Sequence, residues 1–347
     1  MRIVVDVMGG DHGCKVVIEG VKQALESDGS IAKLFLVGNE SEIKAARESV
    51  GLQDARVEVV HASEVLTMED KPLEGIRRKK DSSMVRAIEL VREDQADAII
   101  SPGNTGALVA GSMKLRRLEG VERPAIAARM PSRAQDFILI DAGANPVCEP
   151  SHLAQFAVMG NLYAREILGQ TRPRVGVLSN GSEESKGNDL TREAARLCAL
   201  LDFNFIGYVE GFHLFEDGVD VVVADGFTGN VVLKTAESLG YAMMHLLKSE
   251  LTRNPLRTFG AMLARGAFRD LKRRLDPEVY GGAVLLGLNG IVIKMHGSAR
   301  ARAVSNAIRV AAEEIRHDIN QKLLLEIGRA NKRLAEDSGA APATKCA

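Results

Sequence analysis

The arrangement of apolar and polar positions divides the chain into two kinds of segment. Short runs rich in β-branched residues alternate with longer stretches in which apolar residues recur every three or four positions. The short runs are almost continuously apolar, which predicts strands covered on both faces of a sheet. They are RIVVDVM (2–8), LFLVG (34–38), VEVVH (57–61), ADAIIS (96–101), FILIDAG (137–143), RVGVLSN (174–180), FNFIGYVEG (203–211), VDVVVADG (219–226) and IVIKMHG (291–297). The helical patterns span 16–25, 82–93, 105–118, 152–168, 190–201 and 301–334.

This alternation of strands and helices predicts an α/β fold with a largely parallel sheet. In such sheets, ligands bind beyond the carboxyl ends of the strands. Glycine-rich loops follow several of the predicted strands, so we expect these loops to hold a ligand.

Residues 228–275 depart from the alternation, because their pattern is helical without an intervening strand. Pro255 follows Asn254 and predicts the start of a second helix there. From that point apolar residues recur at spacings of three or four, and basic residues fill other positions, which predicts an amphipathic, basic helix. The apolar set is Leu256, Phe259, Leu263, Ala267, Leu271 and Leu275, and the basic set is Arg257, Arg265, Arg269, Lys272, Arg273 and Arg274.

Composition narrows the class of protein. The 347 residues are 46% hydrophobic, which is enough for one large or two ordinary domains. The net charge of −1 and the absence of Trp argue against a nucleic-acid binder. The cysteines are scattered without a CxxC pair, so neither a zinc site nor a disulfide framework is indicated, and a reducing cytoplasm is expected. They are Cys14, Cys148, Cys198 and Cys346.

Two further classes are not supported. The opening MRIVVDVMGGD is typical of a strand and a turn rather than of a signal peptide. No apolar run reaches the roughly 20 residues that a membrane span needs.

The loop SPGNTGAL follows a predicted strand and opens a helix. Asn104 or Thr105 can cap that helix, and Gly103 and Gly106 allow a ligand to approach the backbone closely. The free N–H groups and the helix dipole favour an anion. An ordinary strand–turn–helix junction that binds no ligand explains the same residues equally well.

The segment ADGFTGNVVLK repeats this arrangement with more polar chemistry. Asp225 ends a strand, Thr228, Gly229 and Asn230 lead into a helix, and Lys234 lies one turn inside it. The G-K-[ST] of a phosphate-binding P-loop is absent, as is a GxGxxG dinucleotide fingerprint. Lys234 is therefore either a phosphate contact or a solvated helix lysine.

Three other loops carry titratable groups. Lys186 stands in SNGSEESKGND among glycines and hydroxyls, and is either a phosphate contact or solvated. His296, two residues after Lys294, is either a proton donor or a structural histidine. In DVMGGDHG, Asp6 and Asp11 surround two glycines, Gly9 and Gly10. Such carboxylates can bind a metal or shape a turn, and we favour the turn and expect no metal. Catalysis by Cys14 is not supported, since no base is assured beside it.

A run of four basic residues precedes a predicted helix: Arg77, Arg78, Lys79 and Lys80. It is either a solvated turn or a docking site for an acidic partner.

The motifs DVMGGD, KKDSSM, SPGNTGAL, LIDAGAN, SEESKGN, ADGFTGNVVLK and GLNGIVIKMHGS occur in this order. Together they resemble the PlsX family of bacterial phosphate acyltransferases, from Arg2 to about Ile315. Each motif is weak alone, but seven in order are highly specific. The chain departs from the family pattern at Pro102, where Ala is expected, and at Cys14, where Pro is more usual.

The resemblance implies a three-layer α/β/α fold like that of phosphotransacetylases and isocitrate-dehydrogenase-like proteins, in a homodimer. It implies conversion of fatty acyl-[acyl carrier protein] and inorganic phosphate into acyl phosphate, for phosphatidic acid synthesis. Phosphate is itself a nucleophile, so the reaction needs charge neutralisation and an oxyanion site rather than a catalytic triad or a cofactor. Our candidate catalytic residues are Lys186, Asn230, His296 and Asp225. Those for phosphate and substrate are Asp6, Gly9, Gly10, Asn104, Thr105, Gly106, Thr228, Gly229, Lys234 and Lys294.

The resemblance also implies partners. The basic run at 77–80 would dock acyl carrier protein, and the acyl phosphate would pass to a membrane acyltransferase. Leu256, Phe259 and Leu263 would contact an anionic membrane surface, so the protein would be cytoplasmic and peripheral to the inner face of the cell membrane. Packing of that helix in the core or in the dimer is the alternative.

We expect residues 1–335 to form one catalytic unit, or two intertwined subdomains, with a helical insertion around 238–280 and a flexible tail at 336–347. The alternative functions are a phosphotransacetylase acting on a short-chain acyl-coenzyme A, a non-catalytic membrane scaffold, and a decarboxylating dehydrogenase on the related fold. The last needs a metal-binding carboxylate cluster and a nicotinamide site, and neither is evident in the sequence.

Overall fold

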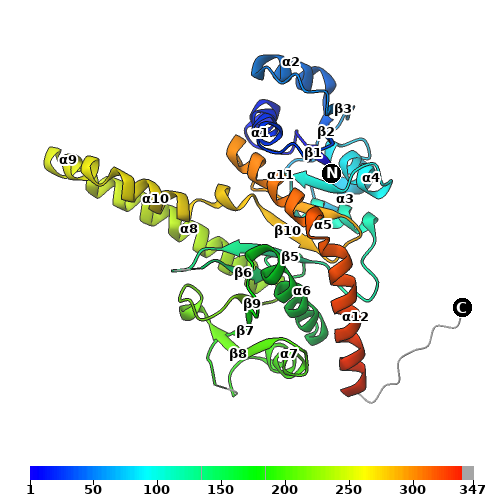
Figure 1. Cartoon of the computed structure of the whole chain (residues 1–347), viewed down its shortest axis with the longest axis vertical. Coiled ribbons are helices and arrows are strands. Elements are labelled where there is room, and N and C mark those ends of the chain that lie inside the picture. Colours follow the sequence, from blue (N-terminus) through cyan, green and yellow to red (C-terminus); the bar gives the residue numbers. More distant parts are fainter. Residues whose placement is uncertain (134, 184, 338–347) are drawn as a thin grey trace, which may run out of the picture.

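The structure is a computed structural model that describes residues 1–133, 135–183 and 185–337 (Figure 1). Within these residues eleven strands form a single sheet in the order β3-β2-β1-β4-β11-β10-β5-β6-β9-β7-β8. The strands are β1 (Arg2–Asp6), β2 (Lys33–Gly38), β3 (Val57–His61), β4 (Ala98–Ser101), β5 (Ala125–Met130), β6 (Phe137–Ile140), β7 (Arg174–Ser179), β8 (Asn204–Glu210), β9 (Val221–Val223), β10 (Ala283–Leu286) and β11 (Ile291–Lys294).

The helices cover both faces of this sheet. They are α1 (Gly13–Ser27), α2 (Glu40–Val50), α3 (Pro72–Arg78), α4 (Ser83–Arg92), α5 (Thr105–Ser112), α6 (Pro150–Leu168), α7 (Asp189–Ala199), α8 (Gly226–Leu251), α9 (Pro255–Leu263), α10 (Arg265–Leu275), α11 (Ala301–Arg316) and α12 (Ile319–Asp337), with 3₁₀ turns at Met113–Leu115, Gly211–His213 and Pro277–Tyr280.

Successive strand residues enter opposite cores, as the continuous apolar runs predicted. Ile3 and Val5 of β1 join one buried cluster with α1, α6 and α11, whereas Val4 joins another with α4 and α5. Both faces of the sheet are therefore buried, and the three-layer α/β/α fold is confirmed.

Strand directions divide the sheet into two groups. Strands β1 to β4 and β11 run parallel to one another. The antiparallel pairs β11–β10, β10–β5 and β5–β6 then reverse the direction three times, so that β6, β9, β7 and β8 run opposite to the first group. The carboxyl ends of the two groups consequently lie at opposite edges of the sheet. The sequence pattern missed β5 and β10, and so missed this reversal.

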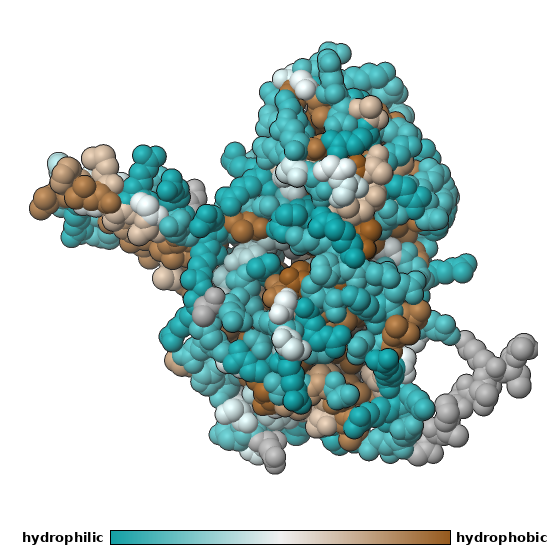
Figure 2. Space-filling model, viewed as in Figure 1, coloured by the Kyte–Doolittle hydropathy of each residue, from teal (hydrophilic) through white to brown (hydrophobic). Residues whose placement is uncertain are grey.

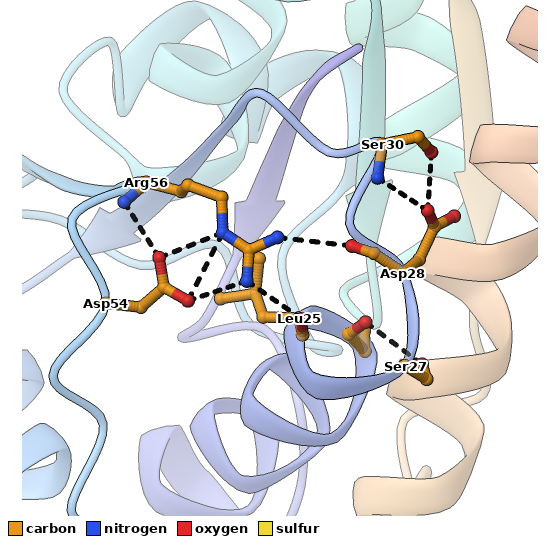
Figure 3. Close-up of polar contacts among 7 residues, drawn as sticks. Leu25, Ser27, Asp28, Ser30, Asp54 and Arg56 are labelled. Atoms are coloured by element: carbon orange, nitrogen blue, oxygen red, sulfur yellow. Dashed lines mark hydrogen bonds and ion pairs between the residues drawn. The ribbon is translucent and has the colours of Figure 1, made fainter.

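Polar contacts join the end of α1 to the segment before β3 (Figure 3). The guanidinium of Arg56 donates to the carbonyl oxygens of Leu25 and Asp28, which lie where α1 runs out of internal partners. Asp54 fixes that guanidinium with bonds of 2.7 to 3.2 Å, and Arg56 holds the pKa of Asp54 down to about 2. The Arg316 side chain joins Asp28 to α11 at 2.9 Å.

The helical region predicted at 228–275 is present and forms an arm. Helix α8 begins against the body and continues into α9 and α10, which project away from it (Figure 1). Asn254 caps α9 and Pro255 is its first residue, as expected. The single helix expected after Pro255 is two helices that meet at Ala264.

The helix expected at 301–334 is likewise two, α11 and α12, and Asp318 between them has φ of 51°. Helix α12 continues through Asp337, two residues into the expected tail, and residues 338–347 lie outside the described part of the chain. No helix in the described residues has the length and apolar content required to cross a membrane.

Candidate functional site

Three loops meet at the carboxyl ends of β1, β4 and β11. A Cβ placed on Gly9 would lie 2.8 Å from Gly103, and one on Gly10 would lie 3.4 Å from the carbonyl oxygen of Gly297. The N–H of Asp11 donates to that same oxygen at 2.9 Å. The glycines of DVMGGD are thus required for the close packing of the loops that follow β1, β4 and β11.

Asp6 lies beneath these loops and is buried. Its carboxylate accepts from Ser101 Oγ at 2.7 Å and from the N–H of Met8 at 3.2 Å, and Ser101 Oγ in turn accepts from the N–H of Gly103 at 3.1 Å. These contacts fit the turn-shaping role expected from the sequence. Among the described residues, no group of three or more His, Cys, Asp and Glu side chains is arranged to hold a metal ion.

Lys294 ends β11 beside this junction. Its Nζ donates to the carbonyl oxygen of Pro102 at 3.2 Å and also to that of Met295. Burial and, after it, the nearby charge of Lys234 lower the pKa of Lys294 to about 8, while Asp6 and Asp11 oppose the shift. A partly buried ammonium within electrostatic reach of a second ammonium favours binding of an anion.

His296 follows two residues later. Its Nδ1 lies 2.8 Å from Ser298 Oγ, which leaves the other ring nitrogen toward solvent or ligand. Desolvation of the ring lowers the pKa of His296, and Lys234 and Lys294 contribute in the same direction. The imidazole is therefore mostly neutral at pH 7 and can donate one hydrogen bond.

Lys234 reaches this site from α8. The helix begins after β9 and packs against β6, and the charge of Lys234, two turns along, acts on both Lys294 and His296. Its Nζ is 2.8 Å from Glu237 Oε2, and its side chain is 53% exposed. Asn230 lies one turn back on the same helical face and beside Gly143.

The N-terminus of α8 is fixed by its own residues. The carboxylate of Asp225 accepts from the N–H groups of Phe227 and Thr228 at 3.0 and 2.9 Å, and from Thr228 Oγ1 at 2.7 Å. Gly229 packs directly on the carbonyl oxygen of Asp141. Asp225, Thr228 and Gly229 thus anchor the helix, and the two N–H groups expected to meet an anion are already taken.

Asp141 accepts hydrogen bonds from several backbone groups, a role that the sequence analysis did not predict. Its buried carboxylate accepts five hydrogen bonds of 2.7 to 3.1 Å, from the N–H groups of Ile126, Gly143, Ala144 and Asn145 and from the Asn145 side chain. Burial raises the pKa of Asp141 in spite of these donors. The motif LIDAGAN, an acidic residue after a buried strand and before small residues, was the available signal.

Lys186 is exposed on the loop after β7, where its stem lies over Gly181. Strand β7 is five positions from β11 in the sheet, about 24 Å at the usual strand spacing. Its carboxyl end also lies at the other sheet edge. The structure therefore brings Lys234, Lys294 and His296 together, with Asn230 one turn away, but does not bring Lys186 to them.

Asn104 caps α5 by accepting from the N–H of Ala107 at 3.0 Å. Its amide nitrogen donates to the carbonyl oxygens of Met68 and Asp70 at 3.2 and 3.3 Å. Thr105 and Gly106 are exposed in the first turn of α5. This loop therefore contacts the segment before α3 as well as the phosphate candidates.

The basic run lies at the end of α3 and just beyond it. Arg77, Arg78 and Lys80 are exposed, and in the described part of the chain none of the three has an ion-pair partner. Lys79 differs, since its Nζ lies 2.6 Å from Asp70 Oδ2.

The expected membrane residues lie on α9, at the end of the arm. Leu256, Phe259 and Leu263 are 80%, 57% and 76% exposed. Figure 2 shows apolar surface along the arm and at its tip. Packing of these side chains in the core of the same chain is thereby excluded.

The described cysteines are poor nucleophiles. Burial raises the pKa of Cys14 and Cys198 to about 12 and that of Cys148 to about 11. Cys346 lies outside the described residues.

Comparison with known proteins connects this geometry with a family. Residues 1–322 match the family model described as "Fatty acid synthesis protein". The chain is 44% identical to "Phosphate acyltransferase" of Syntrophotalea carbinolica, over 96% of both chains. It is 46% identical to the protein of that name from Pelotomaculum thermopropionicum, over 91% of this chain and 92% of the other.

Among solved structures, a phosphotransacetylase from Streptococcus pyogenes superposes with a TM-score of 0.61 at 18% identity. The match covers 91% of this chain and 94% of the other. This likeness concerns the fold and agrees with the predicted architecture.

Proposed function

This chain belongs to the fatty acid synthesis protein family, whose curated relatives are phosphate acyltransferases, and it is a transferase; we propose that it transfers a fatty acyl group from acyl carrier protein to inorganic phosphate. The products are acyl phosphate and free carrier. The acyl phosphate would serve phosphatidic acid and phospholipid synthesis through a membrane acyltransferase.

The observation that carries this proposal is the cation pair Lys234 and Lys294. Burial first, and then repulsion from the charge of Lys234, lowers the pKa of Lys294 to about 8, although Asp6 and Asp11 act in the opposite direction. Such repulsion is unfavourable in the empty site and is relieved when a dianion binds between the two groups. Inorganic phosphate has the size and charge for this position.

In the reaction, a phosphate oxygen attacks the thioester carbonyl carbon, and the carbonyl electrons move to its oxygen. The neutral His296 is suited to donate a hydrogen bond to that oxyanion. The amide of Asn230, which lies on the same face of α8 as Lys234, is suited to donate another. The intermediate then collapses, the C–S bond breaks, and the carrier thiolate leaves. Lys294 has a pKa close to the ordinary thiol value of about 8.5, so it is matched to protonate the thiolate.

The acidic carrier would dock at α3. Arg77 lies one turn after Leu73 on α3, Arg78 and Lys80 follow it, and Leu73 is 63% exposed. An exposed apolar side chain on a helix that ends in basic residues suits an acidic, amphipathic partner helix, and opposite charge raises the rate of encounter.

The arm supports proposals about assembly and location. Leu239, Met243 and Leu246 lie along one side of α8 and are 57%, 58% and 63% exposed, so a second copy covering them would complete a homodimer. The tip residues Leu256, Phe259 and Leu263 would rest in the surface layer of an anionic membrane. The protein would then be cytoplasmic and peripheral to the membrane that receives its poorly soluble product.

A turnover assay with palmitoyl-carrier protein and ³²P-labelled phosphate tests the function. We expect label in an organic-extractable acyl phosphate, with one free carrier thiol released for each. Label appearing only with a short-chain acyl-coenzyme A would establish the phosphotransacetylase alternative instead. Thioester loss that is independent of phosphate would refute both.

A further inference from the structure

The four cations of the basic run do not share one environment. Arg77, Arg78 and Lys80 are exposed, whereas the Lys79 side chain is 31% exposed and turns toward the protein. Its Nζ donates to Asp70 Oδ2 at 2.6 Å and to the carbonyl oxygen of Val65 at 2.9 Å. An ammonium with two fixed acceptors is poorly placed to meet an incoming partner.

Asp70 is the centre of the contact. Its carboxylate also accepts from Thr67, through the N–H at 2.7 Å and the hydroxyl at 3.2 Å. Lys79 is the main cause that holds the pKa of Asp70 below its usual range, followed by the N–H of Thr67. The carboxylate thus stays ionised and closes a turn at 67–70.

That turn belongs to a segment that we call the strap, residues 62–71, which joins β3 to α3. The strap is anchored in the core by the buried Ala62 and Leu66. Gly75 of α3 packs on it so closely that a Cβ there would lie 2.7 Å from Leu66 Cδ2. The strap is therefore attached to the helix that carries the basic run.

At its other side the strap touches the phosphate site. The Asn104 amide donates to the carbonyl oxygens of Met68 and Asp70, directly after the loop that packs on Gly9. Met68 Cε lies 3.0 Å from the position that a Cβ on Gly297 would take. Gly297 adjoins His296, so contacts run without a break from Lys79 to the site.

We propose that Lys79 and Asp70 are positioning residues, which hold the strap against the loops of the phosphate site rather than meeting the carrier protein. This inference rests on the proposed function, and it divides the basic run into a docking trio, Arg77, Arg78 and Lys80, and one internal support. Loss of the support should misplace Asn104, Met68 and the His296 loop.

The two roles differ in kinetics. Removing the support should lower kcat and raise the KM for phosphate, so that kcat/KM for phosphate falls about tenfold. Small misplacements near the reacting groups have effects of this size or larger. The salt dependence of carrier binding should stay as in the wild type. Neutralising the docking trio should instead raise the KM for the carrier substrate at low salt and flatten its salt dependence.

The experiment compares Lys79→Met and Asp70→Asn with the wild type, using palmitoyl-carrier protein and varied phosphate at two salt concentrations. Lys79→Arg, which keeps the ion pair, should recover most of the activity. Lys44→Met is the matched control, because it removes an equally short 2.6 Å lysine–carboxylate pair, with Glu40, from α2. Its kinetics should equal those of the wild type. Hydrogen exchange at 62–71 should accelerate in Lys79→Met and Asp70→Asn only.

The proposal is overturned if Lys79→Met raises only the carrier KM, as the trio does, or if neither variant alters strap exchange or the phosphate kinetics. Should Lys79→Met fail to fold, Asp70→Asn, which keeps the side-chain shape, decides alone. Wild-type protein without any phosphate-dependent turnover would instead refute the proposed function, and strap exchange would still report on the support.

Discussion

Replacing Lys294 with Met should change how stability depends on pH. In the folded wild type the pKa of Lys294 is about 8, against 10.5 for a free lysine. Between these values the unfolded chain binds more protons than the folded one, so the wild type gains stability as the pH rises. Below about pH 8 the folded wild type is destabilised by the full unfavourable free energy of the partly buried Lys294 ammonium. Lys294→Met bears none at any pH.

The magnitude follows from the two pKa values. At 1.36 kcal/mol for each unit, the free energy of unfolding of the wild type minus that of Lys294→Met should rise by roughly 2.5 kcal/mol between about pH 7 and about pH 10. Lys294→Met also loses the bonds to the carbonyl oxygens of Pro102 and Met295. That loss does not depend on pH, so it does not contribute to the rise. Groups that titrate alike in both proteins cancel as well.

Urea unfolding in phosphate-free buffer measures this difference. The chain has no Trp, so far-UV circular dichroism is the suitable probe. Phosphate at 100 times its dissociation constant should stabilise the wild type by about 2.7 kcal/mol, and Lys294→Met by less at the same concentration. If the difference in free energy of unfolding between the wild type and Lys294→Met stays constant or falls as the pH rises, the Lys294 ammonium is not destabilised by its surroundings and this reasoning is refuted.

Three other predictions concern separate parts of the molecule. Replacing all four cysteines with Ser should leave substantial activity; an acyl group trapped on any cysteine during turnover would contradict this. Asn230→Ala should lower kcat/KM by on the order of 10²-fold; normal kinetics in the folded variant would remove Asn230 from the site. Leu263→Glu should abolish binding to anionic vesicles, measured by co-sedimentation, while turnover of carrier substrate in solution persists; if the variant dissociates instead, the arm tip belongs to the dimer.

Most of the fold could be predicted because burial on both sheet faces leaves continuous apolar runs. β1, β2 and β9 are such runs, and all were found from the pattern. β5 and β10 were missed, because AIAARM and AVLL contain few β-branched residues. These two strands set the opposite directions of the sheet halves. The glycine-rich loops that follow the two groups of strands therefore start at opposite edges of the sheet.

The site was only partly predictable for a related reason. Lys294 lies at the end of a strand and His296 just after it, so both could be found locally, but the influence of Lys234 on them depends on where α8 runs. Asp225 was a catalytic candidate in the sequence, and in the structure its carboxylate caps α8. Lys79 looked like its neighbours, because no sequence rule reveals that Asp70 lies beneath it.

The central claim is that phosphate, held at Lys234 and Lys294, attacks the thioester directly. A rapid-quench single turnover with enzyme in excess over palmitoyl-carrier protein tests it, by following the free carrier thiol with and without phosphate. We predict no thiol release without phosphate, and release together with acyl phosphate at one common rate when phosphate is present. Release of carrier thiol before phosphate is added, with the acyl group retained on the protein, would contradict the account.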